Sequence, residues 1–231
     1  MRAFADLLET TSAAAATTTA RDLTTAARVK SALKITVSTQ DALIAELITR
    51  VSALVTAHCR LARDSAGALP TFSRETLRAT WYVEPSSRRG TELFLPWRVP
   101  VFTIDSVVED GTTLTAGTDF VLLGSIGGRL RRLSSDAPTE WSAAKIVVTF
   151  KAGFATTTSL ATNIDPAIEA AVIEQIKGAL MGAGRDPAIR SENVPDIAAV
   201  SYAIHGGDTM GASVILPQVR DMLAPWRNPA P

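Results

Sequence analysis

The chain lacks most of the side-chain chemistry from which catalytic and metal sites are built. Its 231 residues contain one cysteine, Cys59, and two histidines, His58 and His205. A single cysteine excludes an intrachain disulfide, as is typical of proteins assembled in a reducing compartment. His58 and Cys59 are neighbours, but a structural zinc site takes about four ligands. We therefore expect no bound metal and interpret His58 as a core or interface histidine.

The chain also lacks an excess of charge of one sign and any long apolar run. Its 23 basic residues balance 23 acidic residues, whereas a protein that coats nucleic acid needs a basic excess. A net charge near zero leaves little repulsion between copies of the chain. No stretch approaches the roughly 18 consecutive apolar residues of a membrane span, and the N-terminus "MRAFADLLET" does not resemble a secretory signal. We expect a cytoplasmic globular protein with no membrane contact.

Catalytic motifs are lacking as well. The segment "GSIGGRLRR" has neither the spacing nor the position of a phosphate loop. Ser201, His205 and Asp208 could form a hydrolase triad in the 201–208 loop, but no Gly-x-Ser-x-Gly elbow accompanies them. The carboxylates are scattered, without the paired environments that acid–base catalysis needs. We predict no catalytic residue, no cofactor and no enzyme activity, with the hydrolase as a remote alternative.

Helical periodicity flanks the middle of the chain. Helices are predicted over 22–34, with Asp22 as its cap, and over about 39–63, with Ser38 and Asp41 as a capping box. The second has the stronger apolar stripe. A third helix follows Asp165, which can cap, and Pro166, which suits the first helical position. A short C-terminal helix begins at Pro217 and stops at Pro225.

A period of two runs through residues 72–152. The segment "RETLRATWYV" alternates apolar and polar side chains, and the pairs Asp110-Gly111 and Gly127-Gly128 are hairpin signals. We expect an antiparallel sheet of about five or six short strands. Arg129 and Arg131 share one face of a strand. We interpret this strand face as exposed to solvent. The alternative is that it forms a rim that contacts an acidic partner or passing DNA.

This order predicts an α+β fold in which a small helical bundle carries an inserted antiparallel β region. Helices would lie within 22–64 and 164–183 and the β insert over 72–152. Residues 1–21 would be an N-terminal extension, and residues 22–227 one domain. Within it, 184–227 would form a loop and an extended C-terminal tail.

Two tryptophans stand in proline-flanked segments, Trp97 in "LPWRVP" and Trp226 in "LAPWRNP". Each precedes an arginine, and Trp and Arg are the residue types that most often dominate interfaces. Packing on the sheet is an equally good interpretation of Trp97. Trp226 lies in a tail broken by prolines, so we favour an interface there.

The joint order of these segments resembles the head–tail connector proteins (adaptor, or head-completion, proteins) of tailed phages and phage-like gene transfer agents. The resemblance covers about residues 22–227 and depends on the order and spacing of several segments together. The N-terminal extension and the 197–213 loop have no counterpart in it. The segments that carry it are "DLTTAARVKSALKI", "DALIAELITRVSALV", "FSRETLRATW", "LFLPWRVPVFTIDSVVEDGTTLTAGTDFVL", "GRLRRL", "KIVVTFKAGF", "IDPAIEAAVIEQIKGAL", "GRDPAIRSE" and "LPQVRDMLAPWR".

The resemblance implies a structural protein of the particle neck, assembled in the host cytoplasm. Copies would form a ring, usually of twelve, on the portal protein, extend the DNA channel and receive a tail-side stopper or terminator protein. DNA would only pass through. A stopper or tail terminator of the same neck is the alternative, and tails that order on assembly would suit sequential addition. By position, the portal-binding residues would be Leu216, Val219, Met222, Leu223, Pro225, Trp226 and Arg227.

The loop "GRDPAIRSENVPD" would lie after the third helix, where Pro187 prevents the helix from continuing. Its charged residues are candidates for salt bridges to a neighbouring subunit or to the portal. A local Arg–Asp pair that fixes the loop is the alternative. The candidate subunit or partner contacts are Arg185, Asp186, Arg190, Glu192, Trp97, Arg129 and Arg131.

Overall fold

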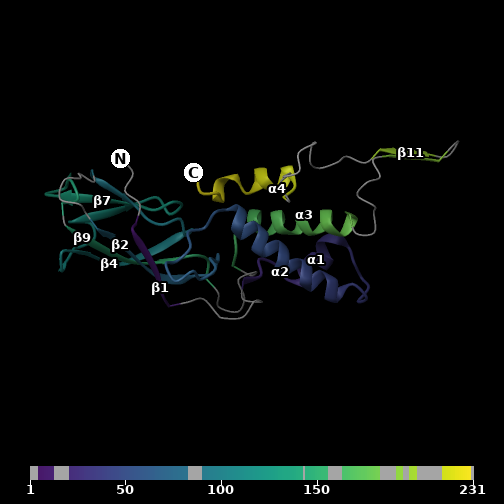
Figure 1. Ribbon diagram of the computed structural model, residues 1–231, viewed down its shortest axis with the longest axis horizontal. Coiled ribbons are helices and arrows are strands. Elements are labelled where there is room, and N and C mark those ends of the chain that lie inside the picture. Colours follow the sequence, from purple (N-terminus) through teal and green to yellow (C-terminus); the bar gives the residue numbers. More distant parts are fainter. Residues whose placement is uncertain are drawn as a thin grey trace.

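The sheets gather at one end of an elongated molecule and the helices at the other (Figure 1). The computed structural model describes residues 5–12, 21–82, 90–142, 144–155, 163–182, 191–194, 198–201 and 215–229, the side chains of 12, 182, 191–194 and 198–201 excepted. The arrangement confirms the α+β class. Within the described residues, no helix is long and apolar enough to cross a membrane.

The helices are α1 (Ala26–Leu33), α2 (Asp41–His58), α3 (Pro166–Gly182) and α4 (Pro217–Met222). The predicted start of α1 is wrong, because Thr25 caps it by accepting the Arg28 N–H, while Asp22 accepts a bond from Thr49. The predicted capping box of α2 is also wrong, since its N-cap residue is Gln40 and makes no side-chain capping bond.

The ends of the longer helices follow local backbone chemistry. α2 stops at His58 rather than near residue 63, because Arg60 adopts a left-handed conformation with φ 53°, which a continuing helix does not allow. The start of α3 is confirmed, since the Asp165 carboxylate accepts the Ala167 N–H at 2.8 Å and Pro166 takes the first position.

The β region contains two antiparallel sheets rather than one. The larger has the order β1-β2-β9-β4-β5, and the smaller has the order β3-β7-β6, with β8 paired to β7. The Asp110-Gly111 and Gly127-Gly128 hairpins are confirmed, because the first joins β4 to β5 and the second lies between β6 and β7. The strands are β1 (Leu7–Ser12), β2 (Glu75–Tyr82), β3 (Glu92–Phe94), β4 (Val101–Glu109), β5 (Thr112–Thr113), β6 (Phe120–Leu123), β7 (Arg129–Ser134), β8 (Ala137–Pro138) and β9 (Lys145–Ala152).

Strand β1 comes from the predicted N-terminal extension. It forms an edge of the larger sheet, with Leu7 opposite Thr80 and Leu8 opposite Ala79 of β2. Leu8 is buried in the core of the sheets. Leu8 of the predicted extension therefore packs on its own chain.

The segment after α3, which was predicted to be a loop, contains two short strands. Residues Ser191–Val194 (β10) and Ala198–Ser201 (β11) pair as an antiparallel two-stranded sheet. In Figure 1, β11 lies beyond the helical end of the molecule.

The buried apolar side chains of the described residues form two hydrophobic cores. One is enclosed by the sheets and includes Trp81, Trp141 and Phe150. The other joins α1, α2, α3 and α4 and includes Ile44 and Ile168. The strands thus bury their apolar faces in one core and the helices bury theirs in the other.

Candidate functional site

The C-terminal segment, comprising α4 and the 3-10 turn Ala224–Trp226, packs on the helical core. Val219 and Leu223 are 0% exposed and Trp226 is 9% exposed. α4 lies along α3 (Figure 1). The Leu216 N–H donates to the Gln175 side chain of α3 at 3.0 Å. The expectations of an extended tail and of an unburied Trp226 are therefore wrong, because the apolar side chains of this segment find partners within the chain.

Trp226 belongs to the helical core, and Trp97 and Phe154 pack against the same core. The ring centroid of Trp226 is 5.7 Å from that of Phe154, and the Trp226 carbonyl oxygen accepts the indole N–H of Trp97 at 3.1 Å. Trp97 in turn covers Gly127, where an added Cβ would lie 2.5 Å from the indole ring. The two tryptophans, predicted separately as interface residues, thus meet at one place. Both are held there by contacts within the chain.

The predicted portal-binding residues divide into two groups. Val219, Leu223 and Trp226 face the core. Pro225 is exposed, while the other members, Leu216, Met222 and Arg227, are partly exposed. An incoming protein can therefore contact only the second group as long as the segment keeps this packing.

His58 and Cys59 lie at the end of α2, beneath the C-terminal segment. Burial lowers the pKa of His58, and the charges of Arg227, Arg220 and Arg60 lower it further. Burial raises the pKa of the Cys59 thiol to about 12. Both groups are therefore uncharged at neutral pH. Within the described residues, no cluster of three or more His, Cys, Asp or Glu side chains could hold a metal.

Arg129 and Arg131 project from one face of β7, as predicted, while Leu130 between them is buried. Their partner is Glu92 on the adjacent strand β3, at 3.2 Å from Arg129 and 2.6 Å from Arg131. Hydrogen bonding to Arg131, with the charges of both arginines, lowers the pKa of Glu92. An acidic partner would have to compete with this carboxylate.

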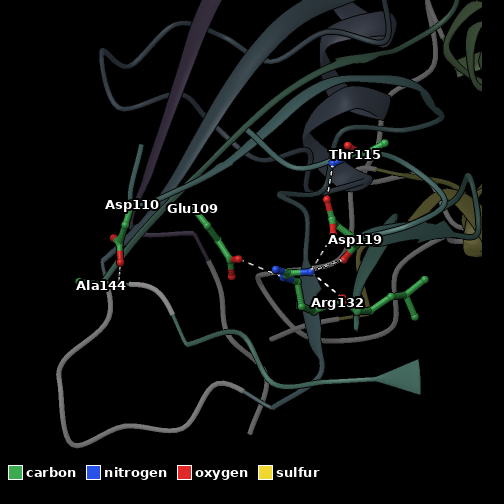
Figure 2. A network of polar contacts seen from close by, with 7 residues as sticks. Glu109, Asp110, Thr115, Asp119, Arg132 and Ala144 are labelled. Carbon is green, nitrogen blue, oxygen red and sulfur yellow. Dashed lines mark hydrogen bonds and ion pairs between the residues drawn. The ribbon is translucent and has the colours of Figure 1, made fainter. Parts of the chain in front are cut away.

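A network of polar contacts in the β region surrounds Arg132 (Figure 2). Its guanidinium contacts the Glu109 carboxylate at 3.0 Å and the carbonyl oxygens of Asp119 and Leu133 at 2.8 and 2.6 Å. The Asp119 carboxylate also accepts the Thr115 N–H at 2.8 Å. Because Glu109 belongs to β4 and Arg132 to β7, the network ties the two sheets together.

The remaining predicted residues belong to the segment between α3 and α4. Arg185, Asp186 and Arg190 lie outside the described residues, as do His205 and Asp208 of the alternative triad. Glu192 and Ser201 lie in β10 and β11, where the backbone alone is described. Sequence reasoning missed Arg60 and Arg220, which gather near Arg227. The sequence signal for an interface was an arginine directly after a tryptophan. Neither Arg60 nor Arg220 follows a tryptophan, so this signal could not find them.

No protein-family model matches the chain, and no curated protein matches it in sequence. Solved structures do share its fold over almost the whole length. A chain in the neck of an empty GTA particle, computed with C6 symmetry, has a TM-score of 0.50 and 16% identity and covers 97% of each chain. A chain in the virion of a native gene transfer agent (GTA) particle has a TM-score of 0.51 and 16% identity, with 97% of this chain and 96% of that chain covered. At this identity the likeness shows the fold, which is the fold that the resemblance implied.

Proposed function

We propose that the chain is a structural protein of the neck of a phage-like particle, where it joins the head to the tail. The supporting observation is the whole-length likeness in fold to a chain of a GTA particle neck. The match covers 97% of each chain, so it includes both the part with the sheets and the part with the helices.

Within the neck, we assign the chain the role of the adaptor that binds the portal. This finer role rests on the resemblance of its sequence segments to head–tail connector proteins. In that role, copies of the chain form a ring, of twelve in the resembled family, that extends the DNA channel. The other face of the ring receives a stopper or terminator. The same fold would also suit a stopper or terminator, which differs in its partner.

The portal-facing surface is then the outer side of the C-terminal segment. Met222, Pro225 and Arg227 remain accessible on it, whereas Val219 and Leu223 are committed to the core. This surface includes fewer residues than the seven that the sequence predicts for portal binding. The buried residues would act indirectly, by holding the outer side in place.

The test is reconstitution with the cognate portal ring, followed by mass photometry and negative-stain imaging. We expect a ring on one end of the portal and a gain of about 290 kDa, which is twelve copies of the 24.4-kDa chain. A portal from an unrelated particle serves as the control. A chain that stays monomeric and ignores its portal would refute the adaptor role.

Photo-crosslinking distinguishes the adaptor from the other neck roles. A photoreactive residue replaces Pro225, which is exposed on the C-terminal segment, and in a matched control it replaces Leu69, which is exposed elsewhere. We expect crosslinks to the portal from position 225 and none from position 69. Crosslinks from position 225 to a tail-side protein instead would assign the chain as a stopper or terminator.

A further inference from the structure

Three arginines surround a hollow of about 610 Å³ between the end of α2 and the C-terminal segment. Arg60 lies in the turn after α2, Arg220 lies in α4, and Arg227 directly follows the 3-10 turn. Asp221 and Asn228 also line the hollow. Arg60 is far from Arg220 and Arg227 in the sequence, yet all three arginines line the same hollow.

The backbone holds this arrangement in place. The Asn228 N–H donates to the Cys59 carbonyl at 3.0 Å, which ties the C-terminal segment to the end of α2. Arg60 adopts φ 53° and its N–H bonds to the Ala57 carbonyl at 3.1 Å. Packing of the buried Leu223 fixes α4 against the same core. The hollow is therefore preformed, and binding there would not require the segment to order.

The positive charges of Arg220 and Arg227 have little compensation within the described residues. Arg220 and Arg227 form no ion pair within the part of the chain that the structure describes, and the Nε of Arg227 is buried without a hydrogen-bond partner there. Arg129, Arg131 and Arg132, in contrast, are all paired with carboxylates. Among the described residues that line the hollow, Asp221 alone is acidic.

The electrostatics of the neighbouring histidine agree with this geometry. His58 lies beside the hollow, and after burial the largest influences that lower its pKa are the charges of Arg227, Arg220 and Arg60. The three guanidinium groups therefore act on one place. Arginine is the residue type best suited to carboxylates, since its planar fork can bind both oxygens.

We propose that the hollow formed by Arg60, Arg220 and Arg227 binds a carboxylate-rich segment of another protein. DNA fits less well, because phosphate contacts need basic residues spread along a track, whereas these converge on one concave site that also contains Asp221. The identity of the partner rests on the proposed function, in which it is the portal. The chemistry of the site does not depend on it.

The first experiment measures binding of a fluorescent peptide of six glutamates by anisotropy, at low and at physiological salt. We expect binding that weakens as salt screens the charges and that falls about tenfold in Arg220→Glu, because an attractive pair becomes repulsive. Arg50→Glu is the matched control, since Arg50 is an exposed arginine on α2 away from the hollow. Arg227→Gln provides a second, milder variant, and circular dichroism confirms that each variant is folded.

The outcomes separate clearly. Loss of binding in Arg220→Glu and Arg227→Gln, but not in Arg50→Glu, supports the proposal. Absence of peptide binding, or equal binding by all folded variants, overturns it. Duplex DNA is titrated in parallel, and tighter binding of DNA with the same dependence on Arg220 overturns the assignment to a protein partner.

The same variants are then tested for attachment to the portal. If the wild-type chain attaches and Arg220→Glu does not, the acidic segment belongs to the portal. If both attach equally, the portal is not the partner of the hollow, although the proposed function stands. If the wild-type chain does not attach at all, the proposed function fails, and the peptide assay still decides the chemistry of the hollow.

Discussion

Replacing Leu223 with alanine tests whether the C-terminal segment packs on its own chain. Leu223 is 0% exposed and lies in the helical core with Val219 and Trp226. The change removes a buried isobutyl group and leaves a cavity. The sequence alone suggests the opposite outcome, since residues that dock on a partner can be truncated without harm to the fold.

The expected loss of stability is about 3 kcal/mol. Buried Leu→Ala changes cost about 2 to 5 kcal/mol, and less where the surroundings collapse into the cavity. Leu223 is fully enclosed, which favours a large cost, but it lies at the end of a six-residue helix, which can shift. In a chain of this length, 3 kcal/mol corresponds to a fall in Tm of roughly 6 to 12 °C.

The assay is urea unfolding followed by tryptophan fluorescence, together with a thermal scan by circular dichroism. Leu69→Ala is the matched control, because it makes the same chemical change at a side chain that is 57% exposed. Its expected effect is within about 0.5 kcal/mol. Trp97 and Trp226 report on the region directly, since they are hydrogen-bonded to each other next to the site of the change.

A Leu223→Ala chain as stable as the Leu69→Ala control would refute this reasoning. The C-terminal segment would then be free in solution, and Val219, Leu223 and Trp226 would be available to a partner. An intermediate value accompanied by loss of the tryptophan signal alone would mean that the segment unfolds locally. That result would also contradict its packing as part of the core.

Three further predictions concern the rest of the chain. Gly153→Ala should prevent or severely destabilise folding, because Gly153 has φ 102° and an added Cβ would lie 2.3 Å from the Ser73 carbonyl oxygen; a soluble, cooperatively melting variant would contradict this. Arg98→Met should cost about 3–5 kcal/mol in urea unfolding, because it removes the 2.8 Å ion pair to the buried Glu75; a neutral effect would show that the pair is dispensable. Cys59 should react with a thiol reagent at pH 8 only after unfolding, because burial raises its pKa to about 12, and stoichiometric labelling of the native chain would contradict its burial.

The sequence predicts best where the pattern is local. The alternation in "RETLRATWYV" correctly assigns the buried face of β2, and Asp165 followed by Pro166 correctly starts α3. Both depend on neighbours within a few residues. The predicted caps of α1 and α2 failed for a related reason, because several side chains near each helix start could serve as cap and small backbone differences choose among them.

Strand β1 and the place of Trp226 could not be read from local pattern. β1 exists because it pairs with β2, and Leu8 lies opposite Ala79, more than sixty residues away in sequence. Trp226 is buried because Trp97, 129 residues earlier, supplies a hydrogen-bond donor and Phe154 supplies an aromatic face. Apolar residues in a proline-rich tail do not show whether their partner is another protein or a distant part of the same chain.

The packing of the C-terminal segment on its own chain affects how that segment would bind a partner. A tail that orders only on assembly must offset its conformational entropy at that moment, whereas this segment is already held by Leu223, Trp226 and the Asn228–Cys59 hydrogen bond. Its apolar side is occupied, so affinity for a partner has to come from the outer side, where Arg220 and Arg227 are found. Attachment through this side should therefore weaken with added salt, while the stability of the free chain, which depends on apolar packing, should change much less.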